Sequence, residues 1–148
     1  HPMDKAIEHL AKAFPLETPE WTAWSANLRP ARLDGAWALS GHDPARGAFF
    51  GQLVVRPVSG ADDEFTTEIT YVYAEDGRTV RRTGRAVVYT GYQWRGRSTG
   101  ASAGDQLREV MFVERGWAEM SGRWFTGDHD ELGMDVTLTR VTRAPSGP

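Results

Sequence analysis

The chain has 148 residues, within the usual size of one domain, and it contains no cysteine. The missing cysteines exclude thiol nucleophiles, thiolate metal ligands, disulfides and covalent c-type haem attachment, but they leave a periplasmic or a cytoplasmic location equally open. The formal net charge of −3 argues against a partner held through its phosphate backbone, so nucleic acid is not an expected partner.

The first 33 residues read as a helix followed by an extended strap. Residues 1–3 look like a remnant of an expression tag. Residues 4–14 carry apolar side chains at helical spacing and stop before Pro15, which predicts a short amphipathic helix. Residues 15–33 combine prolines with Trp21 and Trp24, a pattern typical of a linker with aromatic anchors. The helix needs an apolar surface, either on the domain that follows or on one that precedes it.

A β domain is expected over residues 34–143, with a tail or linker at 144–148. Alternating runs are separated by short turns rich in Gly, Asp and Ser, the pattern of consecutive hairpins. The predicted strands are 35–41, 47–58, 64–74, 79–90, 92–99, 106–114, 117–126 and 132–142.

The alternation within the runs predicts a closed sheet. In the third run Phe65, Ile69 and Tyr71 fall on one face, and in the sixth Leu107, Met111 and Val113 lie opposite Arg108 and Val110. An even number of sequential hairpins favours an all-β, eight-stranded antiparallel up-and-down barrel. An interior of this size is either filled by side chains or holds one small ligand, and the sequence leaves both open.

Motifs for metal binding, catalysis and membrane insertion are weak. The acidic residues of Asp128–Glu131 are adjacent in a turn and cannot all converge on one ion, so no metal is expected. A hydrolase or isomerase site would depend on His42 and His129 with nearby acids, which is the weakest alternative. No apolar run approaches the ~20 residues that a membrane-spanning helix needs.

The most distinctive chemistry combines aromatic residues with arginine. Residues 89–97 and 117–125 carry it, and beyond Lys12 every basic residue other than histidine is an arginine. The candidate interface or pocket residues are Trp94, Arg97, Trp117, Arg123 and Phe125. Period two places Tyr92 and Trp94 on one face of their strand with Arg97 on the other, and it places Trp117, Arg123 and Phe125 together on one face of theirs. The competing interpretation is a set of core aromatics with surface Arg–Glu pairs. For Arg123 we favour the exterior, because the opposite face of its strand, with Met120 and Trp124, has no charge to bury.

Three segments of the chain resemble a known family. They are FPLETPEW at 14–21, RAVVYTGYQWRGRS at 85–98 and REVMFVERGWAEMSGRWFTGDHDELGMDVTL at 108–138. Together they resemble the second domain of the α subunit of quinohemoprotein amine dehydrogenase. That resemblance implies a streptavidin-like barrel within a periplasmic heterotrimer that deaminates primary amines oxidatively.

The resemblance implies a scaffold role for this chain. The family's enzyme carries haem c in another domain and cysteine tryptophylquinone in its small γ subunit. Neither has a counterpart here, because the chain has no Cys-x-x-Cys-His motif and no cysteine at all. We therefore expect a chain without cofactor or activity of its own, whose partners are other domains or subunits of the enzyme. The alternative is a stand-alone small-ligand-binding barrel.

Overall fold

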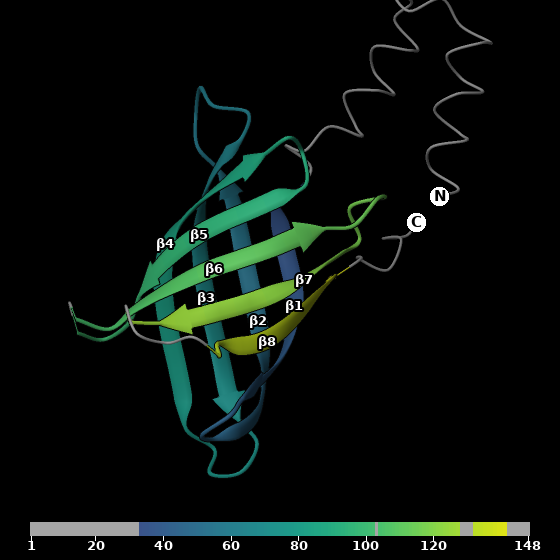
Figure 1. Cartoon of the computed structure of the whole chain (residues 1–148). Helices are drawn as coiled ribbons and strands as arrows, with labels where there is room; N and C mark the ends of the chain where they lie inside the picture. The colour runs from purple at the N-terminus through teal and green to yellow at the C-terminus, as the bar shows by residue number, and fades with distance from the viewer. Residues whose placement is uncertain (1–32, 103, 128–131, 142–148) are drawn as a thin grey trace, which may run out of the picture.

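Eight strands form a closed antiparallel barrel in the computed structural model, which describes residues 33–102, 104–127 and 132–141 (Figure 1). Each strand pairs with the next, and β1 pairs with β8 to close the sheet. The prediction of an all-β, eight-stranded up-and-down barrel is confirmed. The strands are β1 (Gly35–Asp43), β2 (Gly47–Pro57), β3 (Glu64–Tyr73), β4 (Thr79–Tyr89), β5 (Gln93–Thr99), β6 (Gln106–Val113), β7 (Glu119–Thr126) and β8 (Met134–Arg140).

Several expectations fall on residues outside the described part. These are the tag remnant at 1–3, the helix at 4–14, the strap up to residue 32, the acidic turn at 128–131 and the tail at 144–148. In the part that is described, no helix is long and apolar enough to cross a membrane.

The late starts of β7, β8 and β5 relative to the prediction place turn residues outside the strands. β7 begins at Glu119 rather than at 117 because Trp117 has a φ of 55°, which belongs to a turn and not to a strand. β8 begins at Met134 rather than at 132, after Gly133 with a φ of 70°. β5 begins one residue late, which leaves Tyr92 in the turn instead of on the face of Trp94 where alternation had placed it.

Aromatic side chains occupy the barrel interior. Trp37, Trp94 and Trp124 are fully buried, together with Phe49 and Phe65. The ring of Phe49 stacks on that of Trp124 at 6.0 Å, and that of Phe65 stacks on that of Trp94 at 6.1 Å between centroids. The sequence left open whether the interior is filled by side chains or holds a small ligand. In the structure, the chain's own side chains fill it.

Gly84 marks a place where two strands approach closely. A Cβ at this position would lie 1.9 Å from the carbonyl oxygen of Arg97 on β5, an atom of the backbone that cannot move aside alone. The glycine therefore permits the pairing of β4 with β5, the two strands that carry much of the arginine.

Candidate functional site

The structure divides the predicted site residues between the two sides of the sheet. Trp94 is fully buried inside the barrel, whereas Arg97, three residues along β5, is exposed outside. The alternation that put Trp94 and Arg97 on opposite faces is confirmed. The two cannot line one surface, however, so Trp94 belongs to the core and not to an external interface.

Trp117 also departs from the expected outer face of β7. It lies in the turn before that strand, where its backbone N–H donates to the carbonyl of Glu114 over 3.0 Å. Its side chain is partly buried against the core, and its own carbonyl accepts a 3.2 Å hydrogen bond from Arg140 Nε. Trp117 thus covers one end of the barrel instead of presenting a docking surface.

Arg123 and Phe125 lie on the outside of β7, as the alternation predicts. The Arg123 side chain is 53% exposed, its Nε lies 3.4 Å from Oδ1 of Asp135, and its guanidinium donates to the carbonyl of Leu132. The exterior interpretation of Arg123 is therefore confirmed. Phe125 is half-buried beneath the guanidinium of Arg108, whose Cζ lies 5.1 Å from the ring centroid.

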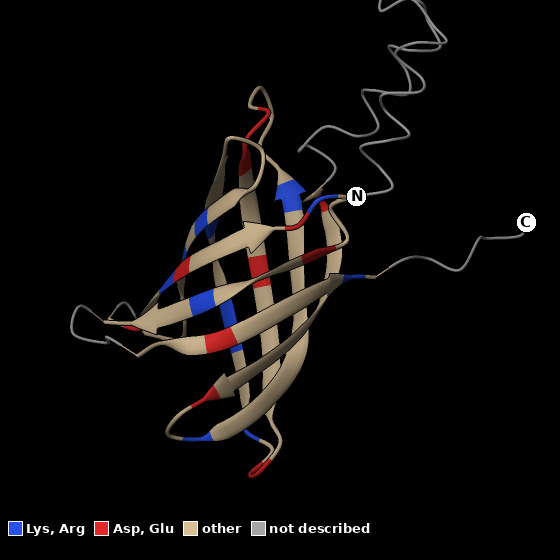
Figure 2. Cartoon of the chain, turned by 45° about the vertical axis from the view of Figure 1, so that its right-hand side comes forward, with Lys and Arg blue, Asp and Glu red and all other residues tan. Residues whose placement is uncertain are grey.

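The outer surface of β4, β5 and β6, which we call the arginine face, is the most strongly charged part of the described sheet. Its outward basic residues are Arg81, Arg85, Arg95, Arg97 and Arg108. The single acid in these three strands is Glu109, and its side chain is completely buried inside the barrel. The acidic loops instead lie at the two ends of the barrel (Figure 2). A chain with a net charge of −3 thus presents a surface with five arginines and no carboxylate.

Three of these arginines form a row across neighbouring strands. Arg85 on β4 lies directly opposite Arg97 on β5, and Arg97 lies directly opposite Arg108 on β6. We call these three residues the arginine row; Phe125 continues it on β7. Like charges directly opposite each other weaken a sheet, since cross-strand side chains are close neighbours.

The arginine row has little internal compensation. Within the described part of the chain, no ion pair or hydrogen bond holds the guanidinium of Arg85, Arg97 or Arg108, although that of Arg108 lies over the Phe125 ring. Arg95 behaves differently, because it donates to the carbonyl of Trp94 over 2.9 Å and lies above the Phe112 ring.

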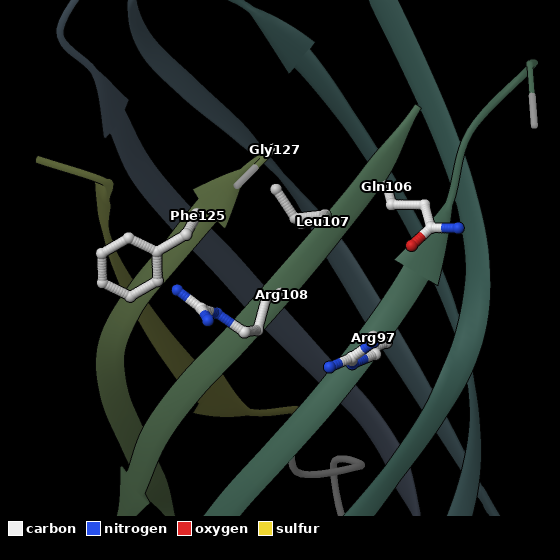
Figure 3. Close-up of a pocket in the computed structure, with 6 residues that line it drawn as sticks. All are labelled: Arg97, Gln106, Leu107, Arg108, Phe125 and Gly127. Carbon is white, nitrogen blue, oxygen red and sulfur yellow. The ribbon is translucent and has the colours of Figure 1, made fainter. Parts of the chain in front are cut away.

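Two hollows adjoin the arginine row. The smaller, of about 80 Å³, is lined by Arg97, Gln106, Leu107, Arg108, Phe125 and Gly127; Figure 3 shows the side chains of Arg108 and Phe125 directed toward each other at its edge. The larger, of about 420 Å³, is lined by Arg85, Arg95, Arg97 and Arg108 and by the half-buried Val87 and Val110, among other residues. Both hollows combine arginine with apolar side chains, so a ligand with an anionic group next to an apolar group would match them.

A second group of polar residues lies inside the barrel, where the sequence analysis placed none. Trp94 Nε1 donates a 2.9 Å hydrogen bond to Oε1 of Glu109. Burial raises the pKa of Glu109 to about 7, against the lowering effects of the Trp94 hydrogen bond, the Arg82 charge and the nearby Ser98 hydroxyl. Gly96 makes room for the carboxyl, since a Cβ there would lie 2.7 Å from Oε1.

Arg82 is buried, unlike the other arginines in the described part of the chain. Its side chain is 3% exposed and pairs through Nη1 with Oδ1 of Asp105 at 2.9 Å, while its Nε donates to Ser98 Oγ over 3.1 Å. Arg82 also donates to the backbone carbonyls of Ser98 and Asp105. These bonds join β4 to β5 at Ser98 and to the turn between β5 and β6 at Asp105, which is a structural role.

Four of these residues were not predicted from the sequence, namely Arg82, Arg85, Arg108 and Glu109. Period-two spacing contained a signal for Glu109, because it lies midway between the inward-facing Leu107 and Met111. The arginine row required the cross-strand register, which alternation within single strands does not supply. No cluster of three or more metal-ligating side chains occurs among the described residues, and His42 lies exposed at the end of β1.

Comparisons with known proteins agree with this architecture. A redesigned β-barrel, mFAP1, solved bound to DFHBI, is 22% identical, with a TM-score of 0.62 over 76% of this chain and 99% of that chain. A second redesigned barrel, mFAP0, also solved bound to DFHBI, is 20% identical with a TM-score of 0.57, over 73% and 98% of the two chains. A de novo designed fluorescence-activating barrel is 17% identical, with a TM-score of 0.57 over 73% and 93%.

These identities support the fold alone, and no curated protein matches the chain. The sequence model of quinohemoprotein amine dehydrogenase, alpha subunit domain II, matches residues 30–141, which includes every strand of the barrel. The chain therefore belongs to the family of domain II of the quinohemoprotein amine dehydrogenase alpha subunit.

Proposed function

We propose that this chain is a non-catalytic interaction domain of a periplasmic amine dehydrogenase, which docks other domains or subunits of the enzyme through its arginine face. The observation that carries the proposal is the arginine face itself. Five arginines, of which Arg95 is half-buried and the others are exposed, lie on the outer face of three adjacent strands without a carboxylate among them, next to the half-buried Phe125. Arginine beside aromatic side chains is the composition enriched at the centres of protein interfaces.

A scaffold role also agrees with the rest of the chain. Haem c and cysteine tryptophylquinone both require cysteine for covalent attachment, so the redox groups of such an enzyme belong to its other parts. The barrel interior is filled by large aromatic side chains, which makes a rigid body with a fixed outer surface. Such a body holds its neighbours at a constant separation. The periplasmic location is inferred from family membership.

The direct test mixes the purified chain with the remaining domains and subunits of the amine dehydrogenase from the same source. We expect co-elution in size-exclusion chromatography, with amine-dependent dye reduction only in the fractions that contain those other parts. The chain alone should be colourless above 350 nm, roughly where haem and quinone absorb. Amine oxidation by the isolated chain, or failure to co-elute at low salt, would overturn the proposal.

Binding of a small ligand inside the barrel is the competing function, and the designed barrels solved with DFHBI share this fold. The interior of this chain argues against it, because three fully buried tryptophans occupy the space that such a ligand would need. Titration with DFHBI provides a simple test. We expect neither fluorescence activation nor a shift of the thermal transition, and either effect would favour the ligand-binding function.

A further inference from the structure

We infer that the arginine row of Arg85, Arg97 and Arg108 is a carboxylate-binding site for an acidic segment of the partner that the proposed docking function requires. This inference rests on the proposed function and adds the chemistry of the partner to it. Its first support is the register, which places three guanidinium groups side by side on three adjacent strands.

The arginine row destabilises the sheet of the isolated chain. Both cross-strand pairs of the row, Arg85 with Arg97 and Arg97 with Arg108, bring like charges together, and no described carboxylate forms an ion pair with any of the three. A glutamate in place of Arg97 would turn both repulsions into attractions. Side-chain pairs that destabilise the folded chain are expected at functional sites, where binding of a partner compensates for the lost stability.

The spacing of the row matches a short acidic segment. Neighbouring strands lie about 4.8 Å apart, so the backbone positions of Arg85 and Arg108 are separated by roughly 10 Å. Carboxylates on one side of an extended segment recur every ~7 Å, and those on one helix face every ~5–6 Å, so two or three of them span the row. Each guanidinium offers a planar fork of donors that suits a carboxylate.

The surroundings favour a protein segment over a nucleic acid. Beside the row, Val87 and Val110 flank Arg95 on the adjoining strands and line the larger hollow, which gives an apolar side chain of the partner a place to pack. A long phosphate polymer would also approach the acidic loops, which carry Asp62 and Asp63 at one end of the barrel and Glu75 and Asp76 at the other. A short acidic segment avoids both loops.

The test measures binding of a fluorescein-labelled peptide of glutamate and leucine to the full chain by fluorescence anisotropy at low salt. A peptide with glutamine in place of glutamate is the ligand control. The row variant combines Arg85→Gln, Arg97→Gln and Arg108→Gln. Its matched control combines Arg46→Gln, Arg56→Gln and Arg78→Gln, which removes the same charge from exposed arginines outside the arginine face.

We expect the row variant to bind the glutamate peptide at least about tenfold more weakly, with the control triple variant within about twofold of the wild type. Equal weakening by both variants, equal binding of the glutamine peptide, or no weakening at all would overturn the inference. A DNA single strand with the same charge as the glutamate peptide is a second control. If it binds more tightly than the peptide and depends on the same three arginines, the row is a phosphate site and the inference is overturned.

A single substitution gives an independent readout. Arg97→Glu should raise the melting temperature by a few degrees, because it relieves two repulsions, and it should abolish binding of the glutamate peptide. A lowered melting temperature with the fold retained, or retained peptide binding, would contradict the inference. Co-elution with the other parts of the enzyme separates the two proposals: if the chain co-elutes and the row variant does so equally well, the docking function stands and the carboxylate site does not.

Discussion

Trp94 and Glu109 join a core aromatic ring to a buried acid through a 2.9 Å hydrogen bond from the indole nitrogen to Oε1. The contact places the single carboxyl of β4–β6 inside the barrel, on the opposite side of the sheet from the arginine face. Its second oxygen, Oε2, is buried and has no hydrogen-bond partner among the described residues. Because the carboxyl points inward, the outer face of these three strands has no acid to balance its arginines, and the carboxyl itself titrates in the barrel interior.

Stability should fall as the pH rises through the titration of Glu109. Burial raises the pKa of Glu109 from 4.5 to about 7, so between these values the folded state binds one proton more than the unfolded state. The free energy of unfolding therefore decreases with rising pH across this window, by about 3 kcal/mol in total. Urea denaturation at roughly pH 5 and pH 8 measures the change.

Glu109→Gln is the matched control for that measurement. Glutamine keeps the shape and the oxygen that accepts from Trp94, but it does not titrate. We expect the difference in unfolding free energy between wild type and variant to depend on pH across the window, with the variant relatively more stable at the alkaline end. A difference independent of pH would show that Glu109 titrates at an ordinary carboxyl pKa.

The Arg82–Asp105 pair should respond asymmetrically to substitution. The Arg82 side chain is 3% exposed, whereas that of Asp105 is 43% exposed. Asp105→Ala leaves a buried guanidinium without its carboxylate and should destabilise the barrel by about 3–5 kcal/mol. Arg82→Met leaves a carboxylate that water can solvate, so we expect a smaller loss. Chemical denaturation of both variants compares them, and a larger loss for Arg82→Met would contradict this explanation.

Gly84→Ala should be strongly destabilising. The added Cβ would lie 1.9 Å from the Arg97 carbonyl oxygen, which forces β4 and β5 apart because the opposing atom belongs to the backbone. We expect a loss of more than about 3 kcal/mol, at the upper end of single substitutions. Thr83→Ala, at the neighbouring exposed position of β4, is the control and should change stability by less than about 0.5 kcal/mol. Thermal denaturation followed by circular dichroism distinguishes the two variants.

Arg123→Ala should leave stability nearly unchanged, within about 0.5 kcal/mol. Its carboxylate partner, Asp135, is 74% exposed, so water replaces the lost ion pair without leaving a buried charge. Denaturant melts of this variant beside the wild type check the expectation. A loss above about 2 kcal/mol would mean that the hydrogen bond to the Leu132 carbonyl fixes the start of β8.

The sequence was sufficient for the number of strands and the side of the sheet on which most residues lie. Period-two alternation depends only on the extended backbone, so Phe65, Ile69 and Tyr71 could be assigned to the interior before any pairing was known. Turn positions were harder. Trp117 and Tyr92 were counted as strand residues, because the backbone conformation of a turn depends on its contacts as well as on its residue types.

What the sequence by itself determined was the eight-stranded barrel and the placement of Trp94 and Arg97, and of Trp124 and Arg123, on opposite faces of their strands, because consecutive hairpins and local alternation encode these features. Only the tertiary structure decided that Arg85, Arg97 and Arg108 lie side by side and that the Glu109 carboxyl meets the Trp94 indole. The physical reason is register: a slip of a strand pair by two residues keeps every side chain on its own face but changes every cross-strand neighbour.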